Sequence, residues 1–131
     1  MRQAVSVEPK DQILVVDDND DTRELMTRLV ERDFLDLEVA SFAWPSAALE
    51  FAGAHVVRLL ITSADMLVAK SGGVVRTLRE KAPGLPVVVV GIDSAAEERA
   101  QEAGADRFVL RSRLAFDLVE VVRALLTCAA G

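Results

Sequence analysis

The chain has very few of the residues from which many reactive sites are built. Cys128 is the single cysteine among 131 residues, and His55 is the single histidine. One cysteine excludes a disulfide within the chain and a metal site made of several cysteines. A lone cysteine also fits a reducing compartment, so we expect a cytoplasmic protein.

Long apolar runs and positive charge are scarce as well. The N-terminal stretch MRQAVSVEPKDQ lacks the apolar core of a signal peptide, and no later apolar run approaches the roughly 20 residues that cross a bilayer. The chain has 15 basic and 21 acidic residues, which gives a net charge of −6. Because this surplus of negative charge opposes contact with phosphate backbones, we expect neither membrane insertion nor direct binding to nucleic acid.

Short apolar runs alternate regularly with helical patterns along the chain, which is 51% hydrophobic. The runs predict strands at 13–16, 37–41, 56–62, 87–90 and 107–110, and the helical patterns predict helices at 20–33, 45–51, 74–81, 95–103 and 114–128. This alternation predicts an α/β fold with a doubly wound, five-stranded parallel sheet. We expect a single domain over residues 12–128 after a flexible lead at 1–11.

In a doubly wound sheet, functional residues gather at the carboxyl ends of the strands. The residues that follow the predicted strands here are Asp17 and Asp18, Thr62 and Ser63, Gly91, and Arg111. The sequence therefore predicts that these side chains meet at one edge of the sheet.

The order of elements, with VVDDNDDTRELM at 15–26 and EAGADRFVLR at 102–111, resembles the receiver domain of bacterial response regulators over nearly the whole chain. The resemblance implies a flavodoxin-like sheet with strand order 2-1-3-4-5. It also implies that two acids after the first strand help to bind magnesium and that an aspartate after the third accepts phosphate. A hydroxyl residue after the fourth strand senses the phosphate, and a lysine after the fifth contacts it.

Asp17 and Asp18 match the acid pair of the family, but other positions depart from its pattern. Counting from both neighbouring helices places Ser63 at the acceptor position. Acyl phosphate formation needs a carboxylate nucleophile beside a divalent cation. We therefore expect no phosphorylation at Ser63, no enzyme activity and weakened Mg²⁺ binding, with no other cofactor.

The resemblance also implies positions that sense and contact the phosphoryl group, and two of the residues there depart from the family pattern. Gly91 replaces the hydroxyl residue and Arg111 the lysine, while Phe108 keeps the aromatic position. With no hydroxyl at 91, the site has lost its phosphate sensor. We expect Arg111 to pair permanently with Asp17 or Asp18 and so to relieve the repulsion between these acids.

Two other functions compete with this interpretation. Asp65 lies two residues beyond Ser63 and would be an alternative acceptor, with Mg²⁺ held by Asp17 and Asp18, if the loop were arranged differently. A flavin or another small ligand on the same fold is the second alternative. The acidic loop DDNDD would repel a phosphate-bearing cofactor, which disfavours this ligand class.

The last predicted helix carries more apolar residues than one sheet needs. Leu114, Leu118, Val121 and Leu125 form a core stripe, whereas Val119, Val122 and Leu126 widen the arc and Phe116 lies on the far side. The surplus predicts a second buried surface. In the receiver family the segments matching 95–103, 107–110 and 114–128 commonly form such an interface. We expect a protein-interaction module that binds a protein partner or a second copy through Phe108, Phe116, Val119, Val122 and Leu126.

Overall fold

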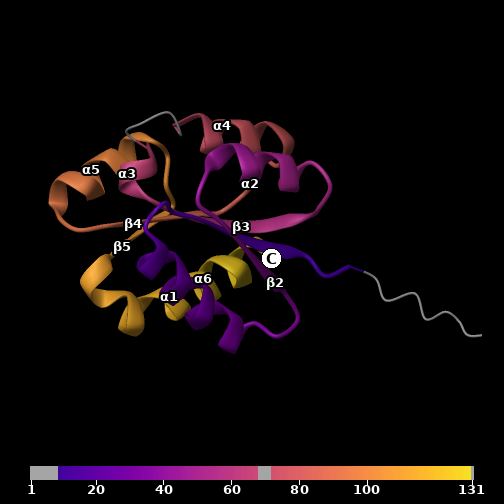
Figure 1. Ribbon diagram of the computed structural model, residues 1–131, viewed down its shortest axis with the longest axis horizontal. Coiled ribbons are helices and arrows are strands. Elements are labelled where there is room, and N and C mark those ends of the chain that lie inside the picture. Colours follow the sequence, from indigo (N-terminus) through magenta and orange to yellow (C-terminus); the bar gives the residue numbers. More distant parts are fainter. Residues whose placement is uncertain (1–8, 68–71, 131) are drawn as a thin grey trace, which may run out of the picture.

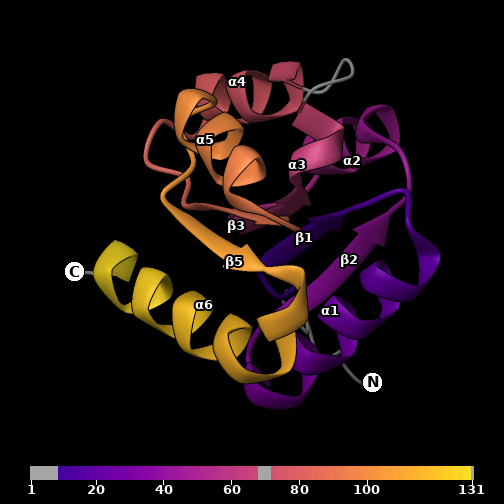
Figure 2. The ribbon, with the colours of Figure 1, turned by 90° about the vertical axis from the view of Figure 1, so that its left-hand side faces the viewer.

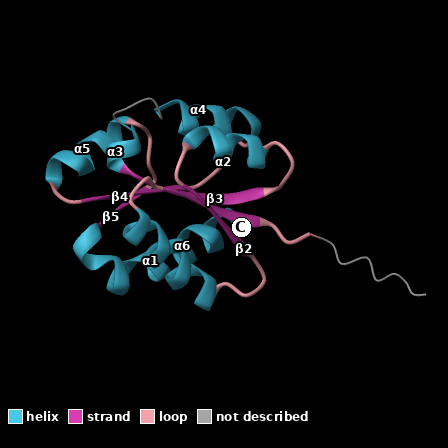
Figure 3. Ribbon diagram, viewed as in Figure 1, coloured by secondary structure: helices cyan, strands magenta, loops and turns pink. Residues whose placement is uncertain are grey.

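Five parallel strands form the centre of the structure, a computed structural model that describes residues 9–67 and 72–130 (Figures 1 and 3). The strands are β1 (Gln12–Val16), β2 (Glu38–Phe42), β3 (Val57–Ser63), β4 (Val87–Gly91) and β5 (Arg107–Leu110). They lie in the order β2-β1-β3-β4-β5. The α/β fold and the strand order predicted from the sequence are confirmed.

Helices cover both faces of the sheet. They are α1 (Asp20–Asp33), α2 (Pro45–Ala52), α3 (Ala64–Met66), α4 (Gly72–Lys81), α5 (Ser94–Glu102) and α6 (Leu114–Ala130), the last preceded by the 3₁₀ turn η2 (Arg111–Arg113). Figures 1 and 2 show α1 and α6 on one face and α2 to α5 on the other. Within residues 9–67 and 72–130, no helix combines the length and the apolar character needed to cross a membrane.

The strands supply apolar side chains to two separate cores because successive residues point to opposite faces. In β1, Leu14 and Val16 join the core under α2, α4 and α5, whereas Ile13 and Val15 join the core under α1 and α6. All five residues of β1 are buried. The uninterrupted apolar run in the sequence therefore reflects a strand covered by helices on both sides.

Polar caps begin three of the helices close to the carboxyl edge of the sheet. The side chain of Asn19 accepts a hydrogen bond from the Thr22 amide at 2.8 Å, and Asp93 accepts one from the Ala96 amide at 2.9 Å. Ser63 accepts a longer one, of 3.3 Å, from the Met66 amide. Such caps satisfy amide groups that have no partner within the first turn of a helix.

The connection between β3 and β4 differs from the prediction. Instead of one loop before the helix, a single turn of helix, α3, follows Ser63 immediately, and α4 begins at Gly72 rather than at Val74. The Ser63 cap stabilises α3, and so short a helix carries too little periodic pattern to be recognised in a sequence. The predicted lead at 1–11 lies mostly outside the described residues.

Part of the predicted interaction face on the final helix is wrong. Leu114, Leu118, Val122 and Leu126 form its buried row, so Val122 and Leu126 belong to the core and are not available to a partner. The apolar arc is wide because α6 packs against α1 as well as the sheet, with Arg123 over the Phe34 ring and 3.4 Å from Asp33. Val119 is partly buried, and Phe116 remains 71% exposed.

Candidate functional site at the carboxyl edge

The carboxyl ends of four strands bring the predicted residues to one edge of the sheet. Val16 of β1 pairs with Thr62 of β3, Ser63 with Val90 of β4, and Gly91 with Leu110 of β5. Asp17 follows β1 directly, and Arg111 follows β5 directly. The parallel register therefore aligns these positions.

Asp17 is the most buried acid of this edge, with 1% of its surface exposed. Its Oδ1 accepts a hydrogen bond from the Asn19 amide at 3.0 Å, and its carbonyl oxygen accepts one from Arg23 at 2.8 Å. Its Oδ2 is buried and has no hydrogen-bond partner among the described residues. A buried carboxylate oxygen without a donor destabilises the charged form.

Burial is the main reason why the pKa of Asp17 is raised above its ordinary value of 3.8. The hydrogen bond from Asn19 opposes this rise, the charge of Asp18 adds to it, the charge of Arg111 opposes it, and the charge of Asp65 adds to it. Asp18 and Asp65 themselves are exposed. Asp17 therefore lies in an acidic environment that one arginine offsets only in part.

Arg111 does not form the ion pair that we predicted. Within the described part of the chain, no carboxylate oxygen of Asp17 or Asp18 lies within 4.0 Å of a guanidinium nitrogen of Arg111. Its Nε is buried and, among the same residues, has no hydrogen-bond partner. Arg111 is part of the turn η2, which directs the chain from β5 into α6.

Thr62 and Ser63 hold their hydroxyl groups inside the molecule. Thr62 is fully buried, and its Oγ1 donates a hydrogen bond to the Val16 carbonyl at 2.9 Å, which ties β3 to β1. Ser63 is 3% exposed and caps α3 through the Met66 amide. Both hydroxyl groups therefore have structural partners.

Gly91 ends β4 where there is no space for a side chain. A Cβ atom at this position would lie 2.5 Å from the Ala96 Cβ and 3.0 Å from Cε1 of Phe108. Real Cβ contacts are essentially never so short. The absence of a side chain at 91 therefore lets the Phe108 ring and α5 pack directly against the end of β4.

His55 lies at the other edge of the sheet. It follows α2 and precedes β3, so the seven residues of β3 separate it from Ser63 by about 20 Å. Its ring stacks on Phe51 at 3.8 Å between centroids, and its Nδ1 lies 2.9 Å from the Phe51 carbonyl oxygen. The histidine therefore cannot act as a base for the Ser63 hydroxyl.

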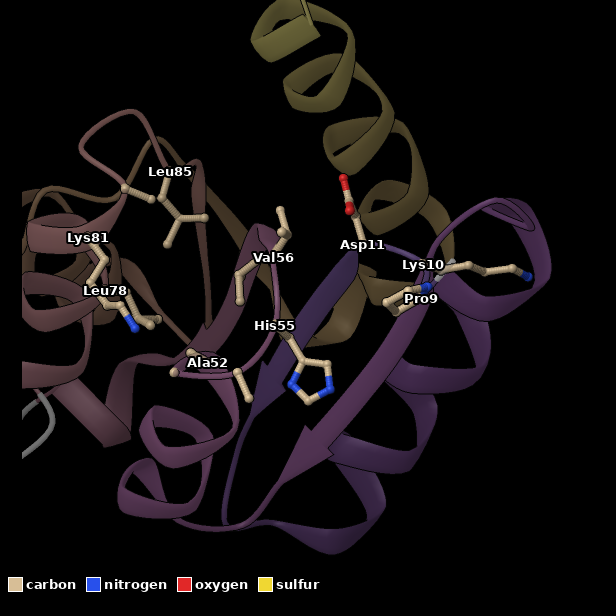
Figure 4. Close-up of a pocket in the computed structure, with 13 residues that line it drawn as sticks. Pro9, Lys10, Asp11, Ala52, His55, Val56, Leu78, Lys81 and Leu85 are labelled. Carbon is tan, nitrogen blue, oxygen red and sulfur yellow. The ribbon is translucent and has the colours of Figure 1, made fainter. Parts of the chain in front are cut away.

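A hollow of about 530 Å³ lies beside His55 at this amino edge (Figure 4). Its walls are mainly apolar and include Leu78 and Leu85. Lys10 and Asp11 line it but point away from it, since Lys10 donates to the Leu35 carbonyl at 3.1 Å and Asp11 lies 3.4 Å from Arg58. This hollow has no connection with the acidic edge.

Sequence comparison identifies the family. The family model described as the response regulator receiver domain matches residues 13–123. The chain belongs to this family. Receiver domains are typically non-catalytic signalling modules, so this chain is a receiver-domain signalling protein. No curated protein matches it.

Solved structures share the receiver fold at low sequence identity. An uncharacterized protein from Neptuniibacter caesariensis is 24% identical over 93% of this chain and 92% of its own, with a TM-score of 0.77. A CheY-like receiver domain protein from Methanospirillum hungatei is 19% identical over 92% and 97%, with a TM-score of 0.75. The receiver domain of NtrX from Brucella abortus is 23% identical over 88% and 98%, also at 0.75.

The acids of this receiver domain fit a tightly held divalent cation poorly. The unpartnered Oδ2 of Asp17 suits a metal ligand, and Asp18 and Asp65 are the other nearby carboxylates. However, no three histidine, cysteine, aspartate or glutamate side chains in ranges 9–67 and 72–130 form a group that could hold a metal ion. Any cation here would rely mainly on Asp17 and on water.

Several residues that shape this edge were not singled out in the sequence. Asn19 and Arg23 fix the loop after β1, and Ala96 fills the space beside Gly91. The acidic residue Asp93 follows β4 closely and caps α5. Asp93 could have been found in the sequence, because aspartate is a common N-cap residue and lies here three residues before the small apolar Ala96. The role of Ala96 depends on a contact with Gly91 that no local pattern reveals.

Proposed function

We propose that this receiver domain acts without aspartyl phosphorylation, as a protein-interaction module that uses the surface of α5, β5 and the start of α6. The observation that carries the proposal is Ser63, which occupies the proposed acceptor position at the end of β3. Its hydroxyl is buried and caps α3, and the single histidine lies at the other edge. A serine without a base is a poor nucleophile.

The environment of Gly91 supports the second part of the proposal. On this interpretation Gly91 replaces a hydroxyl residue that would follow a phosphoryl group, and Phe108 is the aromatic residue that would respond. The Phe108 ring already packs where a side chain at 91 would lie. This packing supports a surface of α5, β5 and α6 whose shape does not depend on events at the acidic edge.

Phosphorylation at Asp65 is the second candidate function. Asp65 is exposed in the first turn of α3, and its charge acts on Asp17, so it belongs to the acidic edge. In this reaction a carboxylate oxygen of Asp65 would attack the phosphorus of acetyl phosphate, and the bond to acetate would break. The exposed position gives access to a phosphodonor, but Asp65 lies two residues beyond the acceptor position that Ser63 occupies in our proposal.

Intact-mass measurement after incubation with acetyl phosphate and Mg²⁺ tests the proposal. We expect no addition of a phosphoryl group to the wild-type chain. Amide NMR spectra recorded with Mg²⁺ and then with beryllium fluoride should show no fluoride-dependent shift at Asp65 or Phe108. A mass increase that disappears in Asp65→Asn would replace our proposal with the second candidate function.

A further inference from the structure

A groove of about 340 Å³ lies between α5, β5 and α6, and Phe108 forms its floor. Its lining includes Phe108 and the partly exposed Leu110. Ile92 directly precedes the lining residue Asp93 and is 66% exposed. Phe116 is 71% exposed, and the guanidinium group of Arg113 lies 5.2 Å from the centre of its ring. Two exposed apolar side chains are therefore next in sequence to residues that line the groove, Ile92 to Asp93 and Phe116 to Asp117.

The charges around the groove are unbalanced. Three carboxylates line it, from Asp93, Glu97 and Asp117, against one arginine, Arg113. Arg113 is already paired with Asp117, at 3.1 Å from Nε to Oδ2. One oxygen of Asp93 caps α5, and the exposed carboxylate of Glu97 has no hydrogen bond or ion pair to a described residue. The groove therefore attracts a positive group.

From these contacts we infer that the groove binds a basic, apolar segment of a partner protein. An apolar side chain of the segment packs on Phe108 and Leu110, and a lysine or arginine beside it reaches Glu97 and Asp93. The volume of the groove lies near the lower end of the range for ligand cavities, which is about 300 Å³. The groove therefore suits one anchor side chain. This inference rests on the proposed function and specifies the chemistry of its partner.

A second copy of the chain is a poor occupant for the same groove. In a two-fold symmetric dimer the same surface of each copy faces the other. The carboxylates of one groove would then approach those of its mate, in a chain whose net charge is already −6. Like charges brought together across an interface weaken association, so the acidic groove favours a basic partner over self-association.

The groove is ready to bind because Gly91 leaves space for its floor. The ring of Phe108 would be 3.0 Å from a Cβ at position 91, and Ala96 would be 2.5 Å from it. An added methyl group at 91 must therefore displace the ring or the start of α5. Binding to the groove should depend on position 91 even though no partner touches it.

Three synthetic peptides test the inference, each with leucines at helical spacing and with lysine, glutamine or glutamate at the remaining positions. Amide NMR titration of the wild-type chain at low ionic strength should show that the lysine peptide shifts the signals of Asp93, Glu97, Phe108 and Leu110. The glutamine peptide should bind at least about fivefold more weakly, the glutamate peptide should not bind measurably, and added salt should weaken the lysine complex.

Two pairs of variants locate the effect. Glu97→Lys should weaken the lysine peptide at least about fivefold, whereas Glu31→Lys, the same charge change on exposed α1, should have little effect. Gly91→Ala should weaken it as well, whereas Gly84→Ala should not, because a Cβ at 84 meets nothing within 4 Å. If Gly91→Ala does not fold, Phe108→Leu tests the floor instead.

The outcomes separate the inference from the function on which it rests. If the glutamine or glutamate peptide binds the groove as tightly as the lysine peptide, the basic partner is wrong and the interaction surface stands. If none of the peptides shifts these four signals, or if the lysine peptide binds equally well to Glu97→Lys, the groove is not the docking site. A fluoride-dependent shift of Phe108 in the Mg²⁺ titration would instead overturn the proposed phosphorylation independence.

Discussion

Neighbouring residues at the end of β1 have opposite environments. Asp17 is 1% exposed, whereas Asp18 is exposed to solvent. The sequence predicted that both acids, Ser63 and Gly91 lie at one edge, because parallel strands end together. It did not predict which acid is buried, since a strand end leaves the period-two pattern and the Asn19 and Arg23 contacts decide the orientation of the loop.

Replacing Asp17 by asparagine should stabilise the fold at neutral pH. Because burial raises the pKa of Asp17 in the folded chain, folding favours the neutral carboxyl, and stability falls as pH rises from the ordinary value of 3.8 through the folded pKa. Asp17→Asn should raise the free energy of unfolding by about 1 kcal/mol at neutral pH in EDTA. Urea unfolding across pH measures this.

The gain from Asp17→Asn should disappear below the ordinary pKa, where the carboxyl is protonated in both states. Asp18→Asn is the matched control, because Asp18 is exposed, and its unfolding free energy should differ little from that of the wild type. An equal gain at acid and neutral pH would show that charge at Asp17 is not the cause.

Placing a carboxylate at position 63 should make stability depend on magnesium. Ser63→Asp adds a charge at a 3% exposed position beside Asp17. In EDTA we expect a loss of about 2 kcal/mol in unfolding free energy, since a buried unpaired charge is among the most destabilising changes. Millimolar Mg²⁺ should restore most of the loss by binding the added ligand. Ser63→Asn should lose stability without rescue, and an equal response of both variants to Mg²⁺ would contradict the expectation.

At the level of single elements, Arg79 connects α4 to the two loops that precede β4 and β5. Arg79 donates hydrogen bonds to the Leu85 carbonyl at 3.1 and 3.2 Å and to the Gly104 carbonyl at 2.7 Å, and lies 2.9 Å from Asp106. Asp106 in turn accepts a hydrogen bond from the Val87 amide at 2.8 Å. These contacts join α4 to the loops before β4 and β5.

Arg79→Ala should lower the free energy of unfolding by about 2 kcal/mol, because it removes several hydrogen bonds to groups with few alternatives. Arg28→Ala is a suitable comparison, because among the described residues the Arg28 side chain forms only an exposed pair with Glu24 on α1. This substitution should cost less than about 0.5 kcal/mol. Thermal and urea unfolding measure both. Equal losses would mean that Arg79 contributes no more than a surface ion pair.

The element level also shows where a helical pattern is ambiguous. The sequence predicted a long apolar helix at 114–128 but gave Val122 and Leu126 to a partner surface. A one-dimensional pattern reports how much of a helix is apolar and not which neighbours share that arc. Here α1 takes part of it, through Phe34 and the contacts around Arg123.

At the level of the whole molecule, two cores share one sheet. Leu60 and Ile61 are adjacent in β3, both fully buried, and point into different cores. Among the residues that the structure describes, each layer of helices packs its apolar side chains against this sheet. The sequence predicted this arrangement well, because short buried runs alternating with helices leave few other ways to cover a parallel sheet.

Damage to either core should destabilise the same cooperative unit. Leu60→Ala and Ile61→Ala should each lower the free energy of unfolding by about 2–4 kcal/mol. Calorimetry should show one transition in each variant, with equal calorimetric and van't Hoff enthalpies. Two resolved transitions in either variant would mean that the helical layers unfold separately.

The tight contact at Gly91 also limits how this molecule could change. A threonine there would have to share its place with the Ala96 methyl group and the Phe108 ring, of which only the ring can rotate away. No single substitution can therefore introduce a hydroxyl group at position 91 without cost. Such a group requires that the Phe108 ring rotate and that position 96 or the start of α5 adjust as well, so the end of β4 lies more than one step from a sequence in which it could respond to a bound phosphoryl group.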